Sequence, residues 1–399
     1  MLKFTEYLIE AEEQTEGKKL THLTHLEDLP VHHGNEGAGM AADFLDSVHN
    51  HLLGKKSTTH LSTKYDGAPS VVFGTHPKTG QFFVATKSAF NKDPKINYTP
   101  EDIERNHGHA PGLVEKLKAA LEHLPKVMPK QGGVYQGDLM HTTGDIETKR
   151  NKISFTPNTI TYSADKDSDE GRAARAAKLG VVAHTQYTGK GDLSNMSAGA
   201  LSDKERATFR NHPDVHNINP TIRSDPSNYT PEDQTEFHSH MDRARKTYSR
   251  MKPEALDALQ GHGTDLEAHI NQTIRTGGKP SVDGYVQHLT DKATREIEKV
   301  KTAGAKDRKM RAHSANIQNI LNNRDHFAKA LELHGHLQRA KNVLARVMAR
   351  NNPFGHSING VETGPEGAVA VDKTGNMTKF VDRDEFSRQN FLRNQGGFQ

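Results

Sequence analysis

Hydrophobic and polar positions change their period along the chain, and each period predicts a different kind of segment. Residues 1–60 carry apolar side chains at helical spacing in two stretches, the second of which ends at Gly54. From about residue 61 to residue 190, short β-branched and aromatic runs alternate with turn signals such as "PKTG", which predicts antiparallel strands. A helical pattern at residues 111–124 interrupts these strands.

The pattern becomes helical and polar from about residue 191 to residue 352. Apolar side chains there repeat every three or four residues until Pro353 stops the helix. The tail returns to alternation in "EGAVAVDKTGNMTKFVDR", two runs around a turn, which predicts a β-hairpin. These patterns predict an α+β protein with an antiparallel-sheet domain interrupted by an α-helical insertion. The predicted segments are residues 1–60 (N-terminal helices), 61–190 (first part of the domain), 191–352 (insertion) and 353–399 (last part of the domain).

Composition narrows the class of protein. A chain of 399 residues predicts two or three structural units. No cysteine is present, which excludes disulfides and cysteine-ligated zinc. No apolar run approaches the roughly 20 residues of a membrane span, and none resembles a secretory signal, so we expect a soluble protein that does not bind a membrane.

The distribution of charge along the chain indicates what kind of partner the protein could bind. Lys and Arg number 53 against 50 Asp and Glu, a net charge of +3, so a polyanion would have to meet a local basic patch. Residues 301–350 hold eleven Lys and Arg against three Asp and Glu. This stretch is either a nucleic-acid surface or an ordinary solvated helix face.

A lysine, an aspartate and a glycine stand close together in "STKYDGAPSVVFG", at the mouth of a predicted strand. A lysine amine becomes a nucleophile only when it is unprotonated, and a glycine lets the backbone approach a bulky ligand. Lys64, Asp66 and Gly67 therefore suit covalent attack on a nucleotide phosphate. The alternative is a surface lysine in a turn.

Five further stretches follow in a fixed order. Lys64-Tyr65-Asp66-Gly67 resembles motif I of the covalent nucleotidyltransferases, the superfamily of ATP-dependent DNA and RNA ligases and mRNA capping enzymes. The later stretches resemble the other motifs of that superfamily: "TKSAFNK" with Lys87 (motif Ia), "VYQGDLM" with Asp138 (III), "ISF" with Phe155 or "TITYSAD" with Tyr162 (IIIa), "PEGAVAV" with Glu366 (IV) and "TKFVDR" with Lys379 (V).

The resemblance implies a role for each position. Lys64 would attack the α-phosphate of ATP and carry AMP, with Asp66 and Gly67 beside it in the nucleotide site. Cations offset the charge that develops on the phosphate. The other implied roles are phosphate binding by Lys87 and Lys379, binding of Mg²⁺ or Mn²⁺ by Glu366, a ribose or metal contact by Asp138, and stacking on adenine by Phe155 or Tyr162.

Two departures and one decoy accompany the resemblance. Asp138 is one methylene shorter than the usual glutamate, and motif V lacks the second lysine that is common there. "SVDGYVQHL" around Asp283 also mimics motif IV, but it continues into a helical pattern, whereas Glu366 opens a hairpin that leads to a lysine. We therefore expect Glu366 to be the functional carboxylate.

The predicted function is that of an ATP-dependent polynucleotide ligase that acts through a lysyl-AMP intermediate. About 20 residues follow Lys379, too few for the five-stranded OB-fold that DNA ligases append, which favours RNA over DNA as substrate. One alternative is a nucleic-acid-binding or structural virion protein with a degenerate nucleotidyltransferase fold. The other is nucleotidyl transfer to a different acceptor.

The N-terminal sequence bears on location. "MLKFTEYLIEAEEQ" resembles the head-targeting peptides of internal virion proteins in contractile-tailed phages, which are cut after Leu-x-Glu, as in Leu8-Ile9-Glu10. This implies packaging in a phage head and action in the host cytoplasm. The alternative is an ordinary N-terminal helix that packs on the domain.

Overall fold

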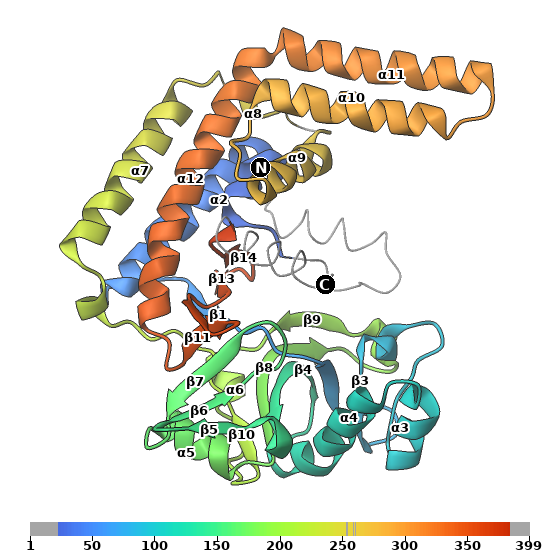
Figure 1. Ribbon diagram of the computed structural model, residues 1–399, viewed down its shortest axis with the longest axis vertical. Helices are drawn as coiled ribbons and strands as arrows, with labels where there is room; N and C mark the ends of the chain where they lie inside the picture. Colours follow the sequence, from blue (N-terminus) through green and yellow to red (C-terminus); the bar gives the residue numbers. More distant parts are fainter. Residues whose placement is uncertain (1–22, 253, 258, 260, 384–399) are drawn as a thin grey trace.

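Helices and sheets occupy different parts of the molecule. The computed structural model describes residues 23–383, except residues 253, 258 and 260. Most of the long helices form an upper layer in Figure 1, and the two larger sheets form the lower part. The prediction of an α+β protein is confirmed. The predicted N-terminal amphipathic helix and its cleavage site lie outside the described residues.

Sheet A joins the beginning and the end of the described chain. Its antiparallel strands, in spatial order, are β1 (His60–Lys64), β13 (Gly367–Val371) and β14 (Met377–Phe380). Lys64 lies opposite Gly367, and Val369 lies opposite Lys379. The hairpin predicted in the tail is confirmed, and its turn is closed by Asp372, whose carboxylate accepts hydrogen bonds from the N–H groups of Thr374 and Asn376.

Sheet B carries two short helices on one face. Its strands in spatial order are β10 (Val215–Asn217), β8 (Leu179–Thr188), β4 (Val134–Thr142), β2 (Ser70–Thr75) and β3 (Phe82–Ala85), with β9 (Ser197–Ala200) paired to β8. The β10–β8 pair is parallel and the others are antiparallel. Apolar side chains of α3 (Pro100–His107) and α4 (Pro111–His123) share a core with this sheet.

Sheet C packs beside sheet B and completes the lower part of the molecule. Its strands are β12 (Val361–Thr363), β11 (Gly355–Ile358), β7 (Thr161–Asp165), β6 (Lys152–Phe155) and β5 (Glu147–Lys149). Its core includes Met140 of β4, Val182 of β8 and Ala174 of α5 (Asp169–Ala176). The core also contains Tyr65, which follows β1, so sheet A is connected directly to this part of the molecule.

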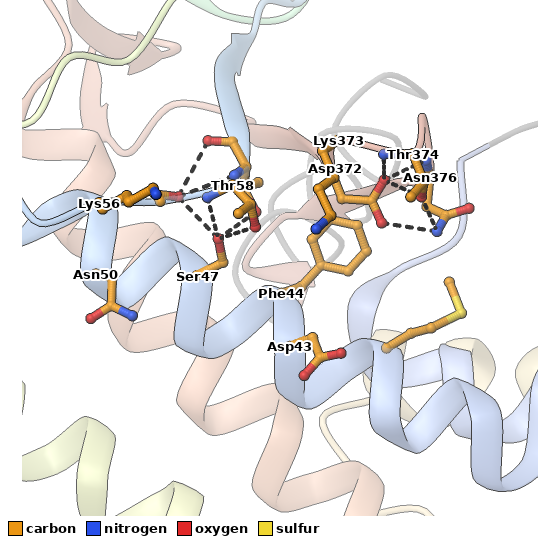
Figure 2. A pocket seen from close by; sticks show the side chains of 13 residues that line it. Asp43, Phe44, Ser47, Asn50, Lys56, Thr58, Asp372, Lys373, Thr374 and Asn376 are labelled. Atoms are coloured by element: carbon orange, nitrogen blue, oxygen red, sulfur yellow. Dashed lines mark hydrogen bonds between the residues drawn. The ribbon is translucent and has the colours of Figure 1, made fainter.

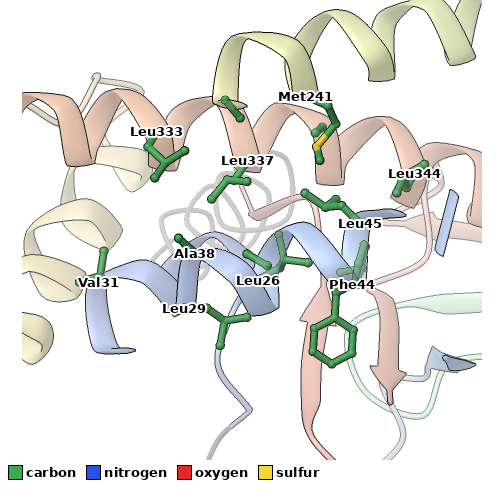
Figure 3. Close-up of a cluster of buried hydrophobic side chains, with 14 of the residues drawn as sticks. Leu26, Leu29, Val31, Ala38, Phe44, Leu45, Met241, Leu333, Leu337 and Leu344 are labelled. Atoms are coloured by element: carbon green, nitrogen blue, oxygen red, sulfur yellow. The ribbon is translucent and has the colours of Figure 1, made fainter. Parts of the chain in front are cut away.

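The helical layer consists of one N-terminal helix and a group from the second half of the chain. These helices are α2 (Leu29–Leu52), α7 (Pro231–Ser249), α8 (Glu254–Asp257), α9 (Gly263–Arg275), α10 (Val282–Glu298), α11 (Ala303–Asn322) and α12 (Arg324–Arg350). Figure 3 shows Leu45 of α2, Met241 of α7 and Leu337 of α12 in the core that these helices share. Ala368 and Phe380 of sheet A belong to the same core, so the helical layer holds sheet A in place.

The predicted insertion of residues 191–352 contains two kinds of structure. Its first part, up to residue 230, adds β9, β10 and the short helix α6 (Asp203–Arg206) beside sheet B. The long helices begin at Pro231, where Thr230 caps α7 by accepting a hydrogen bond from the N–H of Asp233. None of the helices in the described ranges is both long and apolar enough to cross a membrane.

A buried ionic cluster connects the N-terminal segment, α12 and the residues after β14. Lys341 donates to the Glu27 carboxylate at 2.8 and 3.0 Å, and both side chains are fully buried. Arg383 donates to Asp28 at 2.6 Å, and His334 lies 2.9 Å from the same carboxylate. Because each buried charge has a partner of opposite sign, the cluster fixes the segment that carries Glu27 and Asp28 (η1, Leu26–Asp28) against α12.

Candidate functional site

Lys64 and Glu366 meet at the end of sheet A. Lys64 is the last residue of β1 and pairs with Gly367, the first residue of β13, so the residue before Gly367 lies next to the lysine. The Lys64 ammonium donates a hydrogen bond to Oε1 of Glu366. The Lys64 side chain is 35% exposed and the Glu366 side chain is 13% exposed. The pair therefore has a buried carboxylate and a cation that solvent can reach.

Lys379 adds a second cation on β14, the strand next to β13. It lies on β14, opposite Val369, and its backbone N–H donates to the carbonyl of Thr24 at 3.1 Å. Burial, together with the nearby charge of Lys64, lowers the pKa of the Lys379 amine. Burial also raises the pKa of Glu366, although the Lys64 charge opposes this shift. The three groups are thus close enough to influence one another.

Two glycines allow these strands and loops to approach one another. A Cβ on Gly67 would lie 2.6 Å from Cβ of Asp138, so only glycine lets the motif I loop reach β4. Gly367 has φ of +144°, and a Cβ there would lie 2.3 Å from the carbonyl oxygen of Phe380. The glycine after Asp66 and the glycine after Glu366 both have a steric reason.

Asp66 is held by the turn between β6 and β7. Its carboxylate accepts hydrogen bonds from Asn158 Nδ2 at 2.9 Å and from the N–H of Thr159 at 3.0 Å. Its own N–H donates to the hydroxyl of Tyr162 at 2.7 Å. These three bonds fix the loop that follows Lys64. Asn158 and Thr159 were not expected from the sequence, where their only signal is the turn composition of "TPNT".

Asp138 lies beside this loop on β4, opposite Ser70 of β2. Nε2 of His184, on β8, lies 3.5 Å from its carboxylate. Lys87 is exposed and begins a short turn of helix two residues after β3. Because Ala85 pairs with Val72, Lys87 lies at the same end of sheet B as Asp138. His184 was not anticipated, since a single histidine in a strand gives no signal of its neighbours.

The two aromatic candidates lie inside the protein. The rings of Phe155 and Tyr162 are 5.7 Å apart and stacked on each other, with exposures of 2% and 1%. Neither ring presents an open face to a base in this structure. Tyr162 instead orients Asp66, as described above, and Phe155 packs against the ring of Phe354 at 5.7 Å.

The capacity of the site for a metal ion rests on Glu366. Its Oε2 atom is buried and has no hydrogen-bond partner in the structure, while Oε1 contacts Lys64. No group of three or more His, Asp or Glu side chains suited to a metal occurs within residues 23–383 as described. Glu366 would thus be a carboxylate ligand of a metal here, and Mg²⁺ is commonly held by one or two carboxylates together with water and substrate phosphates.

Two cavities lie away from this site. The cavity in Figure 2, of about 620 Å³, is lined by Ser47 and Asn50 of α2, the residues before β1 and the turn of the tail hairpin. There the Ser47 hydroxyl lies 2.7 Å from that of Thr59, at the opposite end of β1 from Lys64. The other, of about 940 Å³, lies between α12 and the α9–α10 loop. Lys64, Glu366 and Lys379 line neither cavity.

The decoy motif lies on a helix. Asp283 is in the first turn of α10, where its carboxylate is bound at 2.6 Å by both terminal nitrogens of Arg324. Some cations of the basic stretch of residues 301–350 are likewise paired within the protein. Lys341 is buried with Glu27, and Arg346 is paired with Asp233 and Glu236.

The comparison with protein families identifies the chain. A model described as a family of unknown function, DUF6267, matches residues 20–395. The chain belongs to this family. No curated protein and no solved structure matches it. Every site residue named above falls within the matched range.

Proposed function

We propose that this DUF6267 protein is an ATP-dependent nucleotidyltransferase that forms a lysyl-AMP intermediate, and that it uses the intermediate to ligate polynucleotides. The observation that carries the proposal is the contact between Lys64 and Glu366, which are 302 residues apart in the chain. Lys379 lies on the adjacent strand, and the Asp66 loop approaches Asp138. These residues come from four motifs of the resemblance: Lys64 and Asp66 from the first, and Asp138, Glu366 and Lys379 from one each.

The proposed first step uses groups that already face one another. Lys64 gives up a proton, which the contacting Glu366 carboxylate can accept, and its nitrogen attacks the α-phosphorus of ATP. The N–P bond forms as the bond to the bridging oxygen breaks, and pyrophosphate leaves with that electron pair. Lys379, on the strand next to β13, would offset the charge on the α-phosphate oxygens.

A divalent metal fits the free oxygen of Glu366. Oε2 is the buried carboxylate oxygen without a hydrogen-bond partner, so it can accept Mg²⁺ or Mn²⁺ without breaking the contact of Oε1 with Lys64. When bound, such an ion would neutralise charge that develops on the phosphate.

The second half of the proposed reaction transfers AMP from Lys64. An oxygen of a polynucleotide 5′-phosphate attacks the phosphorus and the N–P bond breaks, returning the electron pair to the lysine. A 3′-hydroxyl then attacks the activated 5′-phosphate and AMP leaves. We propose RNA rather than DNA as the substrate, in the cytoplasm of a phage-infected host.

Labelling of the protein tests the proposal. Incubation with α-³²P-ATP and Mg²⁺ should leave acid-labile, base-stable label on the protein, as a phosphoramidate would. Lys64→Ala should abolish the label. Lys64→Arg should abolish it equally, because arginine keeps the charge but stays protonated at any working pH.

Matched variants separate this site from the rest of the surface. Glu366→Ala should reduce labelling strongly, whereas Asp283→Ala, which changes the decoy carboxylate, and Lys149→Ala, which changes an exposed lysine, should leave it unchanged. Equal labelling of the wild type and Lys64→Ala would place the nucleophile elsewhere and refute the assignment.

A second candidate function is supported by the burial of Phe155 and Tyr162. Neither ring is open to a base, which favours a nucleic-acid-binding or structural virion protein with a degenerate nucleotidyltransferase fold. The absence of label with either ATP or GTP would favour this candidate. Label that passes to an added protein rather than to RNA would instead favour nucleotidyl transfer to a different acceptor.

A further inference from the structure

Helices α10 and α11 form a two-helix arm that extends from the helical layer. In Figure 1 the arm projects sideways at the top of the molecule, away from α7. The base of the arm is packed, since Leu289 and Ile320 belong to the main core. Between Ala293 and Ile320, however, no residue of the arm is buried. Ile317, near the base, still packs partly against the main core. The outer part of the arm, residues 294–316, therefore contributes no buried side chain to a core.

The outer part of the arm is strongly basic. Residues 299–311 contain six Lys and Arg and a single acidic residue, Asp307, although the whole chain has a net charge of only +3. Asp307 is paired with Arg311 at 2.8 Å, and Glu296 is paired with Lys309 at 2.9 Å. This concentration of charge on an uncovered surface indicates a polyanionic partner.

Most of these cations have no acidic partner of their own. Among the described residues, no ion pair or side-chain hydrogen bond is formed by five cations of the arm: Arg295, Lys299, Lys301, Lys306 and Arg308. This distinguishes the arm from α12, where Lys341 is buried with Glu27 and Arg346 is paired with two carboxylates. Of the basic stretch noticed in the sequence, the part before residue 312 is the part left free to bind phosphates.

We propose that the outer half of the α10–α11 arm binds the phosphate backbone of single-stranded nucleic acid. Its cations are spread along two exposed helices and are not gathered in a pocket, which suits a polymer better than a small anion. The binding is electrostatic and independent of base sequence. That the bound polymer is the substrate of Lys64 rests on the proposed function, whereas the binding itself does not.

The experiment measures binding of a short, 5′-phosphorylated single-stranded RNA by fluorescence anisotropy over a range of salt concentrations. Each phosphate contact contributes about 0.7 to the slope of log K against log salt, which is about fivefold in affinity at about 0.1 M salt. A triple variant, Lys301→Gln with Lys306→Gln and Arg308→Gln, should therefore bind roughly a hundredfold more weakly and with a slope shallower by about 2. Unchanged affinity and slope would overturn the proposal.

A control with the same change in net charge makes this result specific. Lys130→Gln, Lys178→Gln and Lys190→Gln remove three exposed lysines from the part of the molecule that contains sheet B, and should leave the affinity within about twofold of the wild type. If the control lost as much affinity as the arm variant, overall charge and not the arm would explain the binding, and the proposal would fail.

A shortened arm provides an independent variant. Glu296 contacts Lys309, so the two helices lie side by side at that level, and Gly-Gly can replace residues 297–308. Because no residue in that range is buried, the variant should keep the unfolding temperature of the wild type while losing RNA binding. RNA binding that survives the shortening would overturn the proposal.

Two further readouts separate the arm from the chemistry and from other polyanions. Labelling of Lys64 by ATP should be equal in the wild type, the triple variant and the shortened variant. If Lys64 is never labelled while the arm variants lose RNA, the arm stands and the proposed ligase function fails. Polyglutamate should compete with RNA only weakly. Competition as strong as that of unlabelled RNA would overturn the assignment to nucleic acid.

Discussion

The carboxylate of Glu366 combines burial, a contact with a lysine and an oxygen without a partner. Ionisation of a buried carboxylate is unfavourable unless a nearby cation offsets the lost hydration. Here one cation, Lys64, contacts Oε1, and burial still raises the pKa above the ordinary value of 4.5. A second cation beside this carboxylate, such as a metal ion, would therefore stabilise its charged form.

The raised pKa of Glu366 predicts how stability depends on pH. In the folded protein Glu366 keeps its proton to a higher pH than in the unfolded chain, so its contribution to stability is full below pH 4.5 and is lost as the pH rises through the folded pKa. A pKa raised by one corresponds to about 1.4 kcal/mol. Urea unfolding of the wild type and Glu366→Gln should show the difference in unfolding free energy moving in favour of the variant as the pH rises above 4.5.

The same comparison of the wild type with Glu366→Gln also shows which result would contradict a raised pKa of Glu366. All other titrating groups are present in both proteins, so their contributions cancel in the difference. A difference that stays constant with pH would mean that the folded pKa of Glu366 is not raised. Addition of Mg²⁺ should lower the pKa and so flatten the profile of the wild type, if Oε2 is the metal ligand.

At the scale of elements, the pair Glu27–Lys341 joins the N-terminal segment to α12. Removing one partner of a fully buried ion pair costs about 3–5 kcal/mol, and here Arg383, whose Nη1 lies 3.4 Å from Oε1 of Glu27, offsets part of the charge that is left. Lys341→Met alone should therefore lower the free energy of unfolding by about 3 kcal/mol. The double variant Glu27→Gln with Lys341→Met should recover most of this loss. Urea unfolding of both single variants and the double variant measures the coupling, and strictly additive effects would contradict it.

Local pattern predicted many of the elements but not their partners. The alternation in the tail specified the β13–β14 hairpin, and the turn "PKTG" specified the hairpin of β2 and β3. Nothing in the alternation of β1 shows that it pairs with a strand about 300 residues later. Likewise, the spacing of Lys341 on α12 does not reveal burial, because the residue that compensates it, Glu27, lies 314 residues away.

The candidate site was predictable only through the order of its motifs. Lys64, Glu366 and Lys379 are single charged residues, and the pairing of sheet A brings them together: Lys64 is on β1, Glu366 directly precedes β13, and Lys379 is on β14. The role suggested for Phe155 or Tyr162 depended on an open ring face, which sequence cannot show because burial is set by the other strands that cover the ring. Within the predicted insertion the long helices begin only at Pro231, and the short strands before them, such as β9, have little pattern of their own.

At the scale of the whole molecule, the site lies where two cores meet. Sheet A packs into the helical core through Ala368 and Phe380, while Tyr65, directly after Lys64, packs into the core between sheets B and C. Lys64 and Glu366 are thus fixed by the helical layer, and Asp138 by sheet B. A ligand that contacts both groups would connect the two cores.

Together with this arrangement, the proposed function predicts that ATP stabilises the whole molecule. A ligand that binds only the folded state adds about 2.7 kcal/mol at a concentration of 100 times its Kd. With Mg²⁺ present, the unfolding temperature should then rise by roughly 3 °C in a single cooperative transition. Asp138→Asn, on sheet B, and Lys379→Met, on sheet A, should each reduce this rise, because they remove a contact from opposite sides of the site. Asp283→Asn, on α10, should leave it unchanged. If ATP raised the unfolding temperature of Asp138→Asn and Lys379→Met as much as that of the wild type, the nucleotide would bind elsewhere, and the cavity between α2 and the tail hairpin would be the next place to examine.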